Sequence, residues 1–206
     1  MLNSAAITVL FDVGANEGQY GRSLRSSGWT GRIVSFEPLH AAFTKLRAIA
    51  DADAAWTTAE LALGDVAGEV ELNVSRTPMS SSLLPMLSAH EQLVPRSEYT
   101  HTETVRCARL DDVFDEFVGP GMSVGLKIDV QGFEMRVLNG AVNALSRVAL
   151  IEMEINLDLL YEGQPEAANV IRYLDESGFR LVGVEPEHFS PATGQTSWLN
   201  ATFRRS

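Results

Sequence analysis

The chain has 206 residues, of which 45% are hydrophobic and 21% are charged, so it is long enough to bury one core without disulfides or metals. Its net charge of −11 and the lack of any Lys- or Arg-rich run disfavour a nucleic acid as partner, because such proteins neutralise phosphates with a basic face. The single cysteine excludes an internal disulfide, and neither a secretory leader nor an apolar stretch of transmembrane length is visible. We therefore expect one cytoplasmic domain over residues 1–206, without a transmembrane segment, and leave a homo-oligomer open.

The first part of the chain alternates β-rich apolar runs with helical patterns. We predict strands over 7–13, 32–36 and 57–63 and helices over 19–27 and 41–50. The second of these helices has its apolar residues at the three-and-four spacing of one face. This alternation is typical of β-α units.

The pattern changes in the middle of the chain. Residues 69–74 alternate polar and apolar, as an edge or hairpin strand does. Residues 75–104 are irregular and contain three prolines and a triple serine. Because long loops inside compact domains are typical of lids and binding loops, we predict that 75–104 forms a wall or lid of a binding site. A strand over 104–109 and a short helix over 110–117 follow.

The alternation then resumes to the end of the chain. We predict strands over 123–128 and 148–155, helices over 133–147 and 166–176, and a closing hairpin of strands over 179–184 and 197–203. Repeated β-α units predict a doubly wound, mostly parallel α/β sheet with helices on both faces and a C-terminal antiparallel hairpin.

Acidic residues lie at or near the carboxyl ends of the predicted strands. Ligands of such sheets bind at this edge, near the point where the strand order reverses. The sheet itself gains nothing from acids there, so they indicate a functional site. They are Asp12, Glu37, Asp65, Asp129 and Glu154.

The first strand runs into a glycine-rich turn, residues 12–18, with the sequence Asp-Val-Gly-Ala-Asn-Glu-Gly. Its glycines permit a tight turn and close approach of a ligand, and the next helix offers free N–H groups. Glu37 follows about 20 residues later, where an acid can accept hydrogen bonds from both ribose hydroxyls. Together these features predict a nucleoside cofactor.

The turn also indicates which cofactor. Asn16 interrupts the G-x-G pattern of nicotinamide-binding turns, and Asp12 suits the ammonium of a methionine moiety better than a pyrophosphate. S-adenosylmethionine is therefore favoured. An NAD-linked oxidoreductase and a non-catalytic cofactor-binding domain stay open as alternatives.

Seven segments, in order, carry a resemblance to a known family. They are DVGANEG at 12–18, FEP at 36–38, ALGD at 62–65, SSL at 81–83, RLDD at 109–112, KIDVQGFE at 127–134 and LYEG at 160–163. In these the chain resembles FkbM-family methyltransferases over nearly its whole length. The resemblance implies a class I methyltransferase (Rossmann-like) fold with a seven-stranded sheet, S-adenosylmethionine as cofactor, and methyl transfer to an oxygen. The acceptors it implies are sugar hydroxyls of polysaccharides, glycolipids or other natural products.

The same resemblance implies roles for residues of the cofactor site. The ribose is expected at Glu37 and Pro38, and the adenine beside Gly64 and Asp65. The methionine end is expected at the turn and the start of the next helix, at Asp12, Gly14, Ala15, Asn16, Gly18 and Tyr20.

The catalytic candidates are Asp129, Glu154 and Lys127. The two acids have three interpretations: a general base for a sugar hydroxyl, a shared divalent ion such as Mg2+, or a helix cap and an ion-pair partner. Lys127 lies two residues before Asp129 on one strand, so both face the same side and Lys127 can neutralise the acids. Residues expected to contact the small-molecule or oligosaccharide acceptor are Ser81, Ser82, Gln131 and Tyr161.

The remaining chemistry-bearing side chains have ordinary interpretations. The four histidines lack the spacing of a zinc site. His90 and His101 lie in the irregular segment, where a lone histidine is usually solvated. We expect Trp198 and Cys107 to pack in the core.

Overall fold

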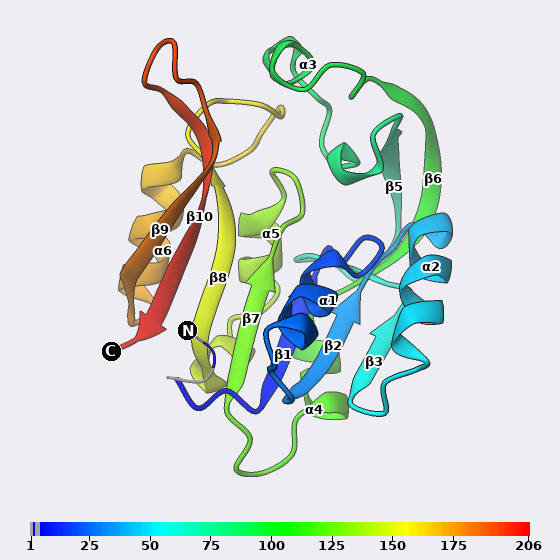
Figure 1. Cartoon of the computed structure of the whole chain (residues 1–206), viewed down its shortest axis with the longest axis vertical. Coiled ribbons are helices and arrows are strands. Elements are labelled where there is room, and N and C mark those ends of the chain that lie inside the picture. Colours follow the sequence, from blue (N-terminus) through cyan, green and yellow to red (C-terminus); the bar gives the residue numbers. More distant parts are fainter. Residues whose placement is uncertain (1, 3–4) are drawn as a thin grey trace.

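A seven-stranded sheet forms the centre of the computed structural model, which describes residue 2 and residues 5–206 (Figure 1). The strands lie in the order β3-β2-β1-β7-β8-β10-β9, and β10 runs antiparallel to both of its neighbours while the other pairs are parallel. The predicted mostly parallel sheet with a C-terminal antiparallel hairpin is thus confirmed. Its strands are β1 (Val9–Val13), β2 (Arg32–Phe36), β3 (Trp56–Ala59), β7 (Val124–Ile128), β8 (Val148–Asn156), β9 (Phe179–Phe189) and β10 (Thr196–Arg205).

Helices cover both faces of the sheet. On one face, α1 (Gln19–Ser26) and α2 (His40–Ala50) enclose a core that includes Leu10; on the other, α4 (Leu110–Phe117), α5 (Glu134–Asn139) and α6 (Ala167–Glu176) enclose a larger core around Phe11. Neighbouring residues of a strand point to opposite faces, so β1 contributes to both cores.

A second, smaller sheet corrects two predictions. The expected strand over 57–63 divides, because β3 ends at Ala59 and β4 (Ala62–Leu63) pairs with β6 (Tyr99–Ala108) of the second sheet, which has the order β4-β6-β5. The segment 75–104 is also more regular than expected. It follows β5 (Gly68–Ser75) and holds the 3-10 helix η1 (Pro78–Ser80), the helix α3 (Ser88–Leu93) and the first half of β6. We call β5, η1, α3 and the first half of β6 the arm. In Figure 1 the arm rises beyond the carboxyl ends of β1, β2 and β7.

The expected helix over 133–147 is interrupted. It ends as α5 at Asn139, and a separate 3-10 helix, η2 (Ala144–Arg147), follows. Asp111 stabilises the break, since its Oδ1 accepts hydrogen bonds from the backbone N–H groups of Asn143 (3.0 Å) and Ala144 (2.8 Å). Such a carboxylate caps η2 as a separate helix.

Most other elements agree with the predicted ones to within one or two residues at their ends, but β9 continues to Phe189, five residues beyond the predicted end. Over residue 2 and residues 5–206, no helix is both long and apolar enough to cross a membrane.

Candidate functional site

A cavity of about 640 Å3 opens at the carboxyl ends of β1, β2, β7 and β8. It lies where the strand order reverses between β1 and β7, the usual ligand site of such sheets. The arm of β5, η1 and α3 forms one wall and the β9–β10 hairpin forms another. Its volume suits a small-molecule site.

The turn after β1 forms the floor of the cavity. The N–H groups of Gly14 and Ala15 both donate to the carbonyl of Phe36, at 3.0 Å, and the turn therefore follows the end of β2. Gly14 has a φ of 77°, and a Cβ there would lie 1.9 Å from the carbonyl oxygen of Asp129. Only glycine permits both this conformation and this approach to β7.

Glu37 closes the turn from the side of β2. Its Oε2 accepts from the N–H of Asn16 and its Oε1 from the N–H of Leu39, both at 2.8 Å. Burial raises its pKa to about 7, although these two hydrogen bonds oppose the rise. A carboxylate has about four acceptor positions, so Glu37, which lines the cavity beside Pro38, keeps lone pairs for a ligand.

The apolar part of the cavity differs from the expected one. Leu61, Leu63 and Phe133 line it, whereas Asp65 forms an ion pair with Arg136 (2.8 Å). Gly64 lies behind the Phe133 ring, which a Cβ at Gly64 would approach to 2.9 Å. Of the segment 61–65, the apolar residues thus face the cavity, and neither Gly64 nor Asp65 does. Leu63 and Phe133 lie within the motifs ALGD and KIDVQGFE, but sequence reasoning missed them because an apolar side chain there has the same pattern as a core residue.

A buried charged row crosses the sheet below the cavity. Lys127 Nζ lies 3.4 Å from Asp12 Oδ1 and 3.4 Å from Asp129 Oδ2, and 5.5 Å from the centre of the Tyr20 ring. Burial alone would lower the pKa of Lys127, but the two carboxylates outweigh it and raise that pKa. Lys127 is therefore a cation fixed between two acids.

Asp12 does not reach the cavity, which corrects its expected contact with the methionine ammonium. It is 0% exposed, and its carboxylate contacts Ser35 Oγ (3.3 Å) and Lys127. Burial raises its pKa. Asp12 contacts Lys127, whose side chain reaches the lining. Beside the larger effect of burial, the charge of Asp12 also raises the pKa of Glu37.

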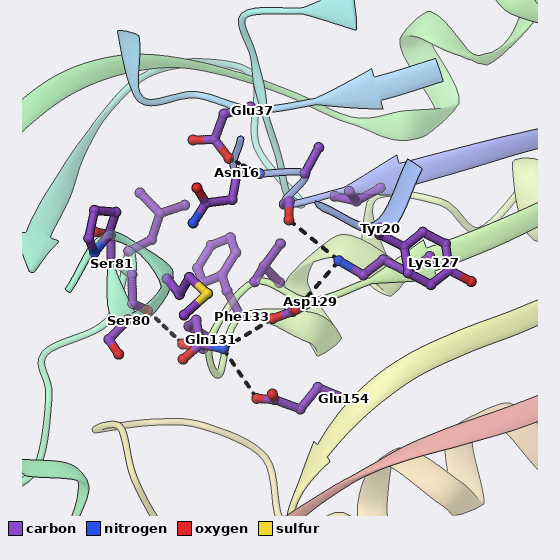
Figure 2. Close-up of a pocket in the computed structure, with 18 of the residues that line it drawn as sticks. Asn16, Tyr20, Glu37, Ser80, Ser81, Lys127, Asp129, Gln131, Phe133 and Glu154 are labelled. Atoms are coloured by element: carbon purple, nitrogen blue, oxygen red, sulfur yellow. Dashed lines mark hydrogen bonds and ion pairs between the residues drawn. The ribbon is translucent and has the colours of Figure 1, made fainter. Parts of the chain in front are cut away.

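Gln131 joins the two catalytic candidates (Figure 2). Its Nε2 donates to Asp129 Oδ1 (3.0 Å) and to Glu154 Oε1 (3.3 Å). Burial raises the pKa of Glu154, and the nearby carboxylates of Asp129 and Glu134 raise it further. Figure 2 shows Glu37 on one side of the cavity and Glu154 on the opposite side, with Asp129 and Gln131 between them.

Tyr161 supports Gln131 from behind. Its hydroxyl donates to Gln131 Oε1 (2.7 Å), and its ring packs against Gly132. Tyr161 is only 1% exposed and is not among the residues that line the cavity, contrary to its expected contact with an acceptor. It is a positioning residue for the Gln131 amide.

The acid pair does not fit a Mg2+ site. Mg2+ requires oxygen ligands in a nearly octahedral arrangement, whereas the N–H groups of Gln131 lie between Asp129 and Glu154. Within the described residues no group of three His, Cys, Asp or Glu side chains is arranged to hold a metal. We therefore assign no step to a metal ion.

The serines of the arm line the cavity but use their hydroxyls locally. Ser81 Oγ accepts from the N–H of Ser75 (3.0 Å), and Ser82 Oγ donates to the carbonyl of Gln131 (2.7 Å). The second bond fixes the arm to the turn after β7. The serines therefore shape the wall of the cavity.

Two aromatic side chains lie elsewhere than expected. His90 is buried, with Nδ1 3.0 Å from Ser97 Oγ, and it lines the cavity; burial lowers its pKa. Trp198 also lines the cavity, and its ring stacks on His188 with 4.3 Å between ring centres. A solvated histidine and a core tryptophan were the sequence predictions.

Comparison with known proteins gives a family and a fold. The family model described as a methyltransferase FkbM domain matches residues 12–181. No curated protein matches the chain.

Several of the solved structures similar to this chain are described as methyltransferases. Streptococcus pneumoniae Sp1610, a putative tRNA (m1A22) methyltransferase in complex with S-adenosyl-L-methionine, has a TM-score of 0.55 and 12% identity over 100% of this chain and 72% of that chain. The methyltransferase domain of bacterial CtHen1 has a TM-score of 0.56 and 8% identity, with coverages of 100% and 93%. An rRNA methylase from Streptococcus thermophilus has a TM-score of 0.50 and 10% identity, with coverages of 97% and 87%. At these identities the likeness shows the fold, which is that of class I methyltransferases.

Proposed function

Because the chain belongs to the FkbM methyltransferase family, we propose that it transfers a methyl group from S-adenosylmethionine to a sugar hydroxyl. The sugar would belong to a polysaccharide, a glycolipid or a glycosylated natural product. The family and the fold make the chain an S-adenosylmethionine-dependent methyltransferase, which replaces the NAD-linked alternative. The oxygen and the sugar are the proposal.

The cavity supplies groups that fit the cofactor. Glu37 retains acceptor positions for the ribose hydroxyls, and Leu61, Leu63 and Phe133 offer apolar surface to the adenine. The turn at Asn16 leads into the N-terminus of α1, which favours the methionine carboxylate. When bound, S-adenosylmethionine supplies a methyl group activated by its positively charged sulfur.

The observation that carries the proposal is the pair of acids that Gln131 joins in the cavity. A sugar hydroxyl becomes a good nucleophile only as its proton leaves. We assign the proton to Asp129, because its carboxylate lines the cavity at the end of β7 and is held in place by Gln131 and Lys127. Asp129 would accept the hydroxyl proton as the acceptor oxygen takes the methyl group, and the electron pair of the broken carbon–sulfur bond would stay on sulfur. Most of the rate would come from positioning in a site that excludes water.

Charge supports a sugar over a nucleic acid as acceptor. Two of the similar structures are RNA methyltransferases, but identities of 10% and 12% carry only the fold. The net charge of −11 and the carboxylates of Glu152, Glu154 and Glu185 at the cavity repel phosphates.

A methyl-transfer assay with labelled cofactor tests the proposal on free sugars, lipid-linked sugars, RNA and protein. We expect methyl ethers of sugars only. Asp129→Asn should lower turnover at least about 100-fold and leave the calorimetric affinity for S-adenosylmethionine within a few-fold. The matched control Asp175→Asn, on the exposed face of α6, should behave as wild type.

Three results would contradict the proposal. Methylation of RNA or protein in place of sugars would overturn the acceptor class. Full activity of Asp129→Asn would remove its assignment as the base. Cofactor binding without transfer to any acceptor would favour the non-catalytic alternative.

A further inference from the structure

The cavity extends past the acid pair onto one face of β8, β10 and β9. In the strand register Asn156 lies opposite Trp198, and Glu154 lies opposite Asn200. On the next strand, Glu185 lies opposite Asn200. These residues line the cavity together with Glu187. We call the group Asn156, Trp198, Asn200, Glu185 and Glu187 the hairpin subsite.

The hairpin subsite offers hydrogen-bond acceptors to a ligand, because the amide donors nearby already have partners. Asn156 is 7% exposed, and its Oδ1 is buried without a partner among the described residues. The Asn200 amide donates to Glu187 Oε1 (2.6 Å), and the Gln131 amide donates to Asp129 and Glu154. Buried polar atoms in folded proteins are nearly always paired with protein, ligand or ordered water, so Asn156 Oδ1 is open to a donor from the cavity. A ligand that fills this part of the cavity and displaces the water has to supply that donor itself.

The charges in the cavity are equally one-sided. In the described part of the chain, Lys127 is the single Lys or Arg that lines the cavity, and it already contacts Asp12 and Asp129. Glu185 and Glu187 therefore lack a cation from the cavity itself. Burial raises the pKa of Glu152 and of Glu154, and the carboxylates of Glu185 and Glu187 respectively contribute to these increases. A cationic ligand would relieve this repulsion.

Trp198 adds a surface for such a ligand. Its ring is partly buried and stacked on His188, with 24° between the ring planes. An indole held in this way attracts a cation above its face and packs against the C–H face of a sugar ring. A ligand that suits this subsite carries a positive charge, hydroxyl donors and an apolar face. The amino sugars combine these three properties.

We propose that the hairpin subsite binds the acceptor and selects an amino sugar with a free ammonium group. The inference rests on the proposed function, since it names the acceptor of the same reaction. The ammonium would lie near Glu185, Glu187 and Trp198, and a ring hydroxyl would donate to Asn156 Oδ1. The hydroxyl to be methylated would then face Asp129.

Equilibrium binding tests the proposal independently of turnover. The probes are the methyl glycosides of D-glucosamine, N-acetyl-D-glucosamine and D-glucose, titrated by NMR into protein saturated with S-adenosylhomocysteine. We expect glucosamine to bind at least about tenfold more tightly than either neutral sugar, and added salt to reduce the difference. The double variant Glu185→Gln/Glu187→Gln should lose most of this preference and keep its affinity for S-adenosylhomocysteine.

Glu176→Gln, on the exposed surface of α6, is the matched control and should keep the preference. Equal or tighter binding of the neutral sugars would overturn the inference, and so would the failure of all three probes to bind. The outcomes separate this inference from the proposed function: methylation of neutral sugars sustains the function and sinks the charge preference. Methylation of RNA or protein alone sinks the function.

Discussion

At the scale of single residues, Glu37 fixes the turn after β1 and also faces the cofactor site. Its two oxygens accept from Asn16 and Leu39, and its pKa is raised to about 7. The ribose hydroxyls would donate to the ionised carboxylate, so a proton on Glu37 competes with the cofactor. This competition makes cofactor affinity depend on pH.

We expect the affinity for S-adenosylmethionine to be constant above about pH 8 and to fall by up to about tenfold per pH unit below pH 7. Glu37→Gln should bind at least about tenfold more weakly at pH 8 and lose this pH dependence. Calorimetry between pH 5.5 and 8.5 measures both effects. Glu60→Gln, at an exposed position, is the control. A Glu37→Gln protein that retained the wild-type slope would contradict the assignment.

The contact between Tyr161 and Gln131 gives a second prediction. Tyr161→Phe removes the donor to Gln131 Oε1, so the amide that joins Asp129 and Glu154 loses its orientation. We expect kcat to fall about tenfold, with the KM for cofactor unchanged. Gln131→Leu should lower kcat further and shift the acidic limb of the pH profile upward, because the two carboxylates then face each other without a shared donor.

Tyr173→Phe is the control, since that hydroxyl donates to the carbonyl of Leu138, at 3.4 Å, and Tyr173 does not line the cavity. An unshifted pH profile in Gln131→Leu would mean that Gln131 has a merely structural role.

At the scale of elements, the sequence predicts what depends on neighbouring residues. The strand–helix alternation, the turn at 12–18 and the acids Asp129 and Glu154 after β7 and within β8 are all local patterns, and the fold follows from them. Both acids lie on the cavity, because parallel strands bring their carboxyl ends to one edge.

Contacts between distant segments were not predictable in the same way. The long strand β6 was partly missed, because its first residues are polar and its partner β5 lies about 30 residues earlier. The apolar pattern around Trp198 predicts a core position, whereas in the folded hairpin the Trp198 side chain lines the cavity. Tyr161 gave no signal that distinguishes a ligand contact from support of Gln131.

The break after α5 gives an element-scale prediction. A Cβ at Gly140 would lie 1.8 Å from the carbonyl oxygen of Gly64, and neither backbone can move without disturbing β4 or α5. Gly140→Ala should therefore destabilise the fold by about 2–4 kcal/mol in urea unfolding. At Gly119 a Cβ would meet only Met122, at 3.8 Å, so Gly119→Ala should change stability by less than about 0.5 kcal/mol. Equal stabilities of the two variants would show that the segments adjust.

At the scale of the whole molecule, the acidic cavity is part of a polar row across the sheet. Ser35, Asp12, Lys127 and Glu152 lie side by side on β2, β1, β7 and β8. One cation serves several carboxylates in this row, and the chain as a whole carries a charge of −11. Preorganised charges of this kind cost stability when no ligand is bound.

Glu134, at the start of α5 and outside this row, is a buried carboxylate whose effect on stability can be measured. It is 3% exposed, and its Oε1 accepts from the N–H groups of Val130 (3.2 Å) and Gly132 (3.1 Å). Burial raises its pKa to about 7, from an ordinary value of 4.5. At a pH between 4.5 and about 7, Glu134 therefore keeps its proton in the folded protein but has lost it in the unfolded chain. The resulting stability is fully present below about pH 4.5 and is lost as the pH rises through 7.

We expect the free energy of unfolding of the ligand-free protein to fall between pH 5 and pH 8, and Glu37 adds to this trend because its pKa is raised in the same direction. For Glu134 alone the loss is on the order of 3 kcal/mol.

Glu134→Gln keeps the acceptor oxygen without the charge, so it should match wild type near pH 5, exceed it near pH 8 and show a shallower slope. Urea unfolding at constant ionic strength measures the slope, with exposed Glu116→Gln as the control that should leave it unchanged. Wild-type stability that rises between pH 5 and pH 8 would contradict the argument, because it would mean that the buried carboxylates are stabilised in their ionised form.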